Sequence, residues 1–243
     1  MSRNAQVESA KMFYRIVITT LICIVSSNGA VAEPALTRPQ RAQVVSVENP
    51  AAIMNLQPDP SIVQTMVNQG VCTLTGQTNL VSAWRSLVST QDVIGIKVFS
   101  EAGMLSGTRP AVVAAVVSDL IAAGIPPQHI VIWDKHDYDL RDAGYYDLAA
   151  QLGVRAAGSA ETGYDPKNFY LPDSVVIGSL IWGDLEFGKT GEGVGKKSFI
   201  TKIVSHQITK IISIAPLLNK EDIGVCGHLY SLALGSIDNA RRF

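Results

Sequence analysis

Apolar residues in the middle of the chain alternate between the spacing of strands and the spacing of a helix. Residues 92–98 read Asp-Val-Ile-Gly-Ile-Lys-Val, a nearly continuous β-branched run that is typical of a buried parallel strand. Residues 108–124 then have one apolar helical face, with Thr108 as a suitable N-cap and Gly124 as a stop. Residues 129–133 are a second apolar run. This order predicts a strand-helix-strand unit, in which both parallel strands end at the same edge of the sheet.

The pattern outside this unit predicts further elements of the same kind. Four segments have helical or extended spacing: helices over 62–67, 80–87 and 140–152, and an extended stretch over 174–182. Thr78 is in a position to cap the second of these helices. Residues 200–218 are apolar, but their spacing does not assign them to a class. We therefore predict an α/β domain over residues 61–243, with a mainly parallel sheet and helices on both faces.

Residues 1–32 have the order of a secretory signal peptide. Basic residues precede the apolar stretch 16–25, small polar residues follow it, and Ala30 to Ala32 form an A-x-A cleavage site. The apolar stretch is far shorter than the ~20 residues of a membrane-spanning helix. We expect cleavage after Ala32, a periplasmic or secreted protein, and no stable membrane anchor after cleavage. Residues 33–60 contain five prolines and little periodicity, which predicts an irregular segment.

Charge and cysteine content exclude some classes of function. The formal net charge is −1 at pH 7, so the chain lacks the basic surplus of a nucleic-acid-binding protein. Cys23 leaves with the signal peptide, and only Cys72 and Cys226 remain. These two either form a disulfide or stay as separate buried thiols. The sequence identifies no cofactor.

Residues 183–190 match the phosphate-binding pattern G-x-x-x-x-G-K-[ST]. The pattern works when a helix follows it, because the amides at the helix N-terminus surround the phosphates. Here Thr190 is followed by Gly-Glu-Gly-Val-Gly, and Asp184 and Glu186 would bring negative charge to the phosphates. We therefore expect a flexible glycine loop that binds no nucleoside triphosphate, although it could still close over another ligand.

Polar residues gather where the two predicted strands end. The second strand runs into Asp134 and His136, at the sheet edge where α/β proteins bind ligands. An acid and an imidazole at this spacing can hold a divalent metal or transfer a proton. The alternative is a polar loop in which Asp139 caps the next helix and His136 faces water.

Lys97, Thr108 and Arg109 are candidates for binding an anion at the same edge. Lys97 lies next to the end of an apolar strand, so it needs a carboxylate such as Asp134 or an anionic ligand. Thr108 and Arg109 begin the helix between the strands, where the helix dipole favours anions. We predict that Lys97, Arg109, Asp134 and His136 converge on one pocket. A separation of Lys97 and Asp134 beyond about 12 Å would contradict this, because side chains of this length could not share a small ligand.

Several motifs in a fixed order resemble the bacterial domain-of-unknown-function family 362. They are Asp92 to Lys97, Gly107 to Val113, Ala123 to Pro126, Ile130 to Asp134, Leu140 to Tyr145, Ser198 to Leu218, Gly224 to Tyr230 and Ala233 to Phe243. The resemblance covers most of the chain after Ser61. The family has no settled activity, so it implies a fold more than a reaction. Its members tend to continue past the Asn-Arg-Arg motif, which implies that the domain is incomplete at Phe243.

The resemblance also bears on cofactors and ligands. Some similar proteins carry ferredoxin-like cysteine clusters, but the two remaining cysteines of this chain cannot supply the four thiolates of an iron–sulfur cluster, so none is expected. Others have a Lys-Asp-His stretch where this chain has Asn-Lys-Glu-Asp, and His228 follows shortly afterwards. Lys220 and His228 are therefore further candidates for contacting a ligand.

Two functions are compatible with these residues, and the sequence favours the first over the second. The first is an exported enzyme or enzyme-like protein acting on a small anionic molecule, which Lys97 and Arg109 bind while Asp134 and His136 handle protons or a metal. The second is a non-catalytic periplasmic ligand-binding or accessory protein that uses the same residues for recognition alone.

Overall fold

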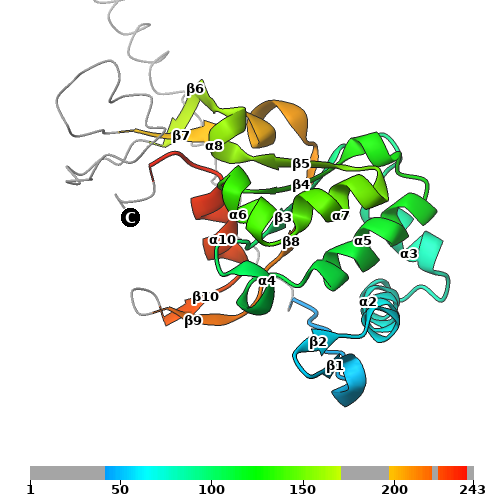
Figure 1. The fold of residues 1–243 in the computed structure, drawn as a ribbon. Coiled ribbons are helices and arrows are strands. Elements are labelled where there is room, and N and C mark those ends of the chain that lie inside the picture. The colour runs from blue at the N-terminus through cyan, green and yellow to red at the C-terminus, as the bar shows by residue number, and fades with distance from the viewer. Residues whose placement is uncertain (1–41, 171–196, 221–223, 240–243) are drawn as a thin grey trace, which may run out of the picture. The chain divides into compact units, whose positions relative to one another are not determined.

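A four-stranded, all-parallel sheet forms the centre of the fold. The computed structural model describes residues 42–170, 197–220 and 224–239, and every element below belongs to the second of two units, residues 44–243. The strands, in their order across the sheet, are β5 (Arg155–Gly158), β4 (Ile130–Asp134), β3 (Ile94–Val98) and β8 (Lys210–Ile214) (Figure 1). In the register, Ile94 of β3 lies opposite Ile130 on one side and Lys210 on the other. The predicted α/β class and parallel sheet are confirmed.

Helices and short strands surround this sheet. The α-helices are α2 (Pro60–Thr75), α3 (Leu80–Leu87), α4 (Gly103–Ser106), α5 (Pro110–Ala122), α6 (Asp137–Asp142), α7 (Tyr145–Leu152), α8 (Ser159–Thr162) and α10 (His228–Gly235). The structure also has the 3₁₀ helices η1 (Pro50–Ala52) and η2 (Pro127–His129) and the π-helix η3 (Ile203–Gln207). Antiparallel pairs are formed by β1 (Ile53–Met54) with β2 (Gln57–Pro58), β6 (Tyr164–Tyr170) with β7 (Ser198–Thr201), and β9 (Leu218–Lys220) with β10 (Gly224–Cys226). Within the described ranges, no helix combines the length and the apolar character needed to cross a membrane.

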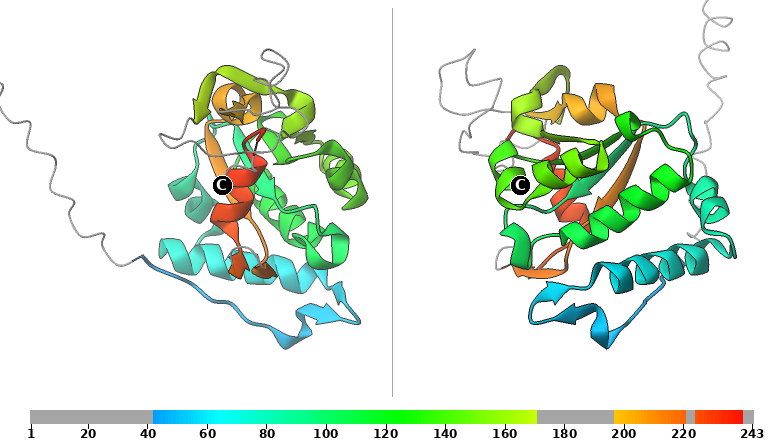
Figure 2. Two further views of the ribbon diagram at one scale, coloured as in Figure 1. Left: turned by 90° about the vertical axis from the view of Figure 1, so that its left-hand side faces the viewer. Right: turned by 45° about the vertical axis from the view of Figure 1, so that its right-hand side comes forward.

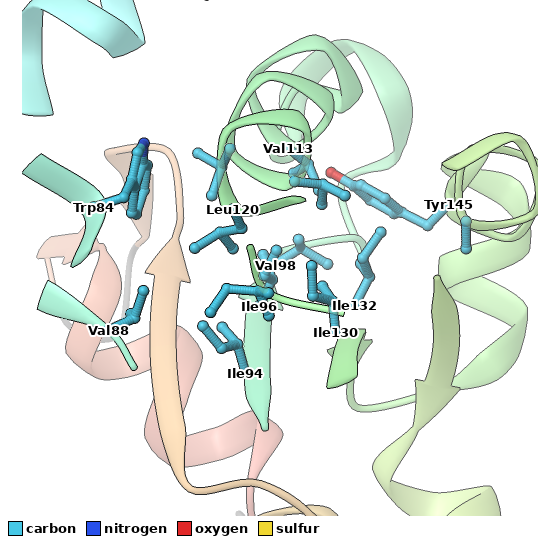
Figure 3. Packing of buried hydrophobic residues seen from close by; sticks show 14 of the residues in the cluster. Trp84, Val88, Ile94, Ile96, Val98, Val113, Leu120, Ile130, Ile132 and Tyr145 are labelled. Carbon is cyan, nitrogen blue, oxygen red and sulfur yellow. The ribbon is translucent and has the colours of Figure 1, made fainter. Parts of the chain in front are cut away.

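The larger hydrophobic core lies between one face of the sheet and α5. Ile94, Ile96 and Val98 alternate along β3, so all three point to this face, and Ile130 and Ile132 do the same from β4. Figure 3 shows these side chains facing α5, with Trp84 at one end of the cluster and Tyr145 at the other. The two apolar runs read from the sequence therefore form β3 and β4, and each of these strands is buried on both faces.

The opposite face of the sheet has a smaller core. Val131 and Trp133 of β4 pack there with Ile203 of η3, and Leu232 of α10 lies against this cluster. Lys97 has the same parity along β3 as Gly95, so it also belongs to this second face. α10 contacts β3 and β8. Figures 1 and 2 show α10 as the red helix beside the sheet.

The order of the strands reverses between β3 and β8. From β3 the chain moves outward through β4 to β5, and it later returns to pair β8 with the other side of β3. In open parallel sheets, ligands bind beyond the carboxyl ends of the strands at such a reversal. In this fold, that place lies beyond Val98 and Ile214.

Three local predictions were wrong in detail. The residue that caps α3 is Asn79, whose side chain accepts a hydrogen bond from Ser82, and not Thr78. The helix expected over 140–152 is divided into α6 and α7 at Gly144, whose φ of 77° lies in the left-handed region that glycine tolerates best. Arg109, not Thr108, occupies the N-cap of α5, and the Thr108 hydroxyl bonds to the backbone of Phe99 and Ile214 instead.

The structure assigns residues 200–218 and the two cysteines, whereas three other predicted segments lie outside the residues that it describes. Residues 200–218, whose class the sequence did not assign, contain the end of β7, the π-helix η3 and the whole of β8. The signal peptide, the glycine loop at 183–190 and the extended stretch at 174–182 lie outside the described residues. Cys72 on α2 is half-buried and Cys226 in β10 is buried, and the structure has them as separate thiols.

A buried carboxylate on α5 holds the outer helices. Asp119 accepts hydrogen bonds from Trp84 Nε1 of α3 at 3.1 Å and from Gln64 Nε2 of α2 at 2.8 Å. Burial raises the pKa of Asp119, and these two bonds oppose the shift. The carboxylate therefore connects three helices through neutral donors, without a cation.

We expect the Asp119→Ala variant to lower the free energy of unfolding by about 2–3 kcal/mol, because it leaves the buried Trp84 and Gln64 donors without an acceptor. Asp119→Asn keeps one carbonyl acceptor and should lose less. Urea denaturation followed by tryptophan fluorescence measures both. Equal losses for the two variants would contradict the role of the hydrogen bonds.

Candidate functional site

Lys97 and Asp134 form a buried ion pair at the carboxyl ends of β3 and β4. Lys97 Nζ lies 2.6 Å from Asp134 Oδ1, and the lysine side chain is fully buried. The predicted proximity of the two side chains is therefore confirmed. Burial lowers the pKa of Lys97, and the charge of Asp134 opposes this shift.

The protein itself satisfies the hydrogen-bonding groups of this pair. The ammonium of Lys97 has three N–H donors. They bond to Asp134, to the carbonyl oxygen of Val98 at 2.6 Å and to the hydroxyl of Ser231 at 3.0 Å. The other carboxylate oxygen, Oδ2, accepts from both the backbone N–H and the hydroxyl of Ser100, each at 2.7 Å. The geometry thus favours the structural alternative for this pair over direct contact with a ligand.

α10 covers the ion pair. Ser231 lies one turn into this helix and bonds to Lys97, and Gly235 at the end of the helix lies against both charged side chains. A Cβ atom at Gly235 would lie 2.2 Å from Lys97 Cε and 3.3 Å from Asp134 Oδ1. Only glycine allows this close approach of the helix to the ion pair.

Lys135 holds the segment that follows α10 at the same edge of the sheet. Its ammonium donates to the carbonyl oxygens of Ile237 and Asp238. Burial lowers the pKa of Lys135 to about 8, and the charge of Asp238 opposes the shift. The Asp238 carboxylate in turn accepts from the backbone N–H of Phe199 in β7 at 2.7 Å. These contacts hold α10 in place from its C-terminal side.

His136 lies beside the Lys97–Asp134 ion pair, in a group of acidic residues. It is the N-cap residue of α6, and its ring stacks on Tyr138 with 4.8 Å between the centroids. Burial lowers the pKa of His136, which favours the neutral imidazole. The pKa of Asp139 is raised to about 6, first by burial and then by the charges of Asp134 and Glu101. The alternative in which Asp139 caps the helix is wrong, because the N-cap position belongs to His136.

An open hollow lies beyond the ends of β3 and β8, where the strand order reverses. It has a volume of about 510 Å³, within the usual range for ligand pockets. One wall is the start of α5 with the loop before it, and the other is the chain that leaves β8. Its lining residues are Leu105, Ser106, Gly107, Thr108, Arg109, Val112, Ile214, Ala215, Pro216 and Leu218.

Thr108 holds the two walls of this hollow together. Its hydroxyl donates to the carbonyl oxygen of Ile214 at 2.6 Å and accepts from the backbone N–H of Phe99 at 2.9 Å. Its own carbonyl oxygen accepts from the Tyr145 hydroxyl at 2.6 Å. Thr108 thus connects the ends of β3 and β8 to the start of α5 and positions Arg109, which comes next in the chain.

Arg109 is the one charged side chain among the described residues that line the hollow. Its Nη1 donates to the carbonyl oxygen of Met104 in α4 at 2.7 Å. This bond uses one of the five guanidinium donors and orients the group. The remaining donors and the positive charge are available for an anion.

The predicted site residues therefore separate into two places along one sheet edge. Lys97 and Asp134 share the ion pair under α10, whereas Thr108 and Arg109 line the hollow. His228 is exposed at the start of α10, with Nδ1 3.2 Å from the hydroxyl of Ser213. The backbone of Lys220 belongs to β9, and its side chain lies outside what the structure describes. The catalytic roles of Asp134 and His136 stay a prediction.

Sequence reasoning missed three residues that complete the ion pair. Ser100 lies two residues after the end of β3, so its position at the carboxyl end of a strand was a usable signal. Ser231 and Gly235 lie more than a hundred residues after Lys97 along the chain. A serine and a glycine in an apolar helix give no local sign that they face a buried charge.

Comparison with protein-family models, curated proteins and solved structures finds no match to this chain. Among residues 42–170, 197–220 and 224–239, no three His, Cys, Asp or Glu side chains are grouped so that they could hold a metal ion.

A double-mutant cycle tests the ion pair. Asp134→Asn and Lys97→Met each leave one buried charge without its partner, so each should lower the free energy of unfolding by about 3–5 kcal/mol. The double variant Lys97→Met/Asp134→Asn leaves no unpaired charge and should lose much less than the sum. Urea denaturation of the four proteins measures the coupling. Losses that simply add would show that the two residues contribute independently.

Asp139 should make stability depend on pH. Its folded pKa of about 6 lies above the unfolded value, so its contribution is full below pH ~4 and is lost as the pH rises through 6. Asp139→Asn should therefore match the wild type at pH 4 and exceed it at pH 7.5. Solvent screens this half-buried carboxylate, so we expect a gain of about 1 kcal/mol.

Urea denaturation at several pH values measures this gain. Asp147→Asn changes an exposed carboxylate of α7 and is the matched control, which should gain nothing at pH 7.5. A wild-type protein whose stability did not fall between pH 4 and 7.5 relative to Asp139→Asn would contradict the raised pKa.

Proposed function

We propose that this chain is an exported, non-catalytic binding protein that holds a small organic anion in the hollow beyond β3 and β8. One observation carries the proposal: the hollow lies where the strand order reverses, and Arg109 supplies its single charge among the described lining residues. The start of α5 adds the positive end of a helix dipole, although Pro110 at its first position has no N–H to donate. The order of residues 1–32 supports export.

Binding without catalysis is the function that the geometry supports best. The Lys97 and Asp134 side chains are buried and hydrogen-bonded to other groups of the protein, so they do not face a ligand in the hollow. The Thr108 hydroxyl, which lines the hollow, already donates one hydrogen bond and accepts another. The enzyme hypothesis would need Asp134 or His136 to reach the ligand, and neither lines the hollow.

The resemblance to the bacterial domain-of-unknown-function family 362 is compatible with this proposal and stays a prediction. The motif at Gly107 to Val113, which is part of the resemblance, contributes Gly107, Thr108, Arg109 and Val112 to the wall of the hollow. The proposal does not depend on the family, because it rests on the position and the chemistry of these residues.

Isothermal titration calorimetry with inorganic phosphate, acetate, benzoate and octanoate tests the proposal. The wild type should bind at least one of these anions, and Arg109→Met should weaken that binding by about tenfold or more, because it removes charge-assisted hydrogen bonds. Arg155→Met is the matched control: Arg155 is exposed at the start of β5, and its loss should leave binding unchanged.

A wild-type protein that binds none of the four anions would overturn the proposed function. Equal weakening by Arg109→Met and Arg155→Met would overturn the assignment to this hollow, because it would show a general effect of charge.

A further inference from the structure

The hollow is lined mainly by apolar side chains. Six of its ten lining residues are apolar: Leu105, Val112, Ile214, Ala215, Pro216 and Leu218. They come from both walls, so a ligand between the walls would touch apolar atoms on either side. A compact inorganic anion would satisfy Arg109 and leave this lining in contact with water.

Large apolar residues beside the hollow are exposed. Met104 and Leu105 of α4 are 53% and 58% exposed, and Leu217, which lies between two lining residues in the chain, is 77% exposed. Adjacent exposed apolar residues mark places where apolar surface is covered by a ligand or partner. Each methylene that moves from water onto such a surface raises affinity roughly fourfold.

The apolar lining favours an apolar part of the ligand, and the charge of the hollow determines which charged group the ligand should carry. Arg109 gives one positive charge, which a single negative charge neutralises. Its planar guanidinium matches the two oxygens of a carboxylate, and the bond to Met104 holds it at the hollow. The acidic residues of this sheet edge, including Asp134 and Asp139, do not line the hollow and so do not repel an anion from within it.

We propose that the ligand is an amphiphilic monocarboxylate, with its carboxylate on Arg109 and an apolar body along Val112, Ile214 and Leu218. Medium-chain fatty acids and aryl carboxylates share this chemistry. The proposal rests on the proposed function and specifies its ligand class.

Three probes separate the apolar and charged contributions. Octanoate has both parts, acetate has only the carboxylate, and octanamide has the chain without the charge. Isothermal titration calorimetry with the whole chain should give octanoate at least tenfold tighter binding than either of the other two.

Two variants assign these contributions to the hollow. Arg109→Met should remove the preference for octanoate over octanamide, because no cation remains for the carboxylate. Leu105→Ser should weaken octanoate several-fold and leave acetate unchanged, and its fold should persist because Leu105 is more than half exposed. Arg155→Met again serves as the control and should change neither probe.

The outcomes distinguish this inference from the proposed function. If acetate or phosphate binds as tightly as octanoate and Arg109→Met weakens it, the amphiphile inference is overturned while the proposed function stands. If octanoate and octanamide bind equally and Arg109→Met changes neither, the binding is apolar adsorption and both proposals fail. If phosphate, acetate, benzoate and octanoate all fail to bind, the proposed function falls first and the inference with it.

Discussion

A charged amine that leaves water at the end of a strand must have each of its hydrogen bonds replaced within the protein. Lys97 meets this requirement with Asp134, with the adjacent backbone and with Ser231 of α10. The requirement extends to the helix, because Ser231 reaches the ammonium only while Gly235 allows α10 to lie directly on the ion pair. The position of the last described helix thus follows from the burial of one lysine.

This arrangement divides the carboxyl edge of the sheet into two parts of opposite character. Between β3 and β4 the edge is closed, because α10 covers the charges and Lys135 holds the segment that follows the helix. Between β3 and β8 the edge is open, with Arg109 at an apolar hollow. Acidic residues lie near the end of β4, where burial and then the charges of Asp134 and Glu101 raise the pKa of Asp139 to about 6. At the hollow, Arg109 is the one charged residue among the described lining residues, so no acidic side chain stands beside it in that lining.

Sequence patterns predicted the centre of the fold well, because the β-branched runs of β3 and β4 and the helix between them are local features. They also predicted that Lys97 and Asp134 would be neighbours, since two parallel strands in sequence end at one edge. They did not separate the ion pair from the hollow. That distinction depends on β8 and α10, which join β3 from more than a hundred residues away and leave no trace in local spacing.

The wide separation of β3 and β8 along the chain also determines when the hollow comes into existence. Ile94 and its partner Lys210 are 116 residues apart, whereas β3 and β4 are joined through a single helix. Because contacts between distant segments carry the larger cost in chain entropy, the β3–β4 unit can assemble before β8 arrives, but the hollow cannot. A ligand held there would bind only the completed fold and would stabilise it by mass action. Occupancy of the hollow would then be a measure of how much of the chain has finished folding.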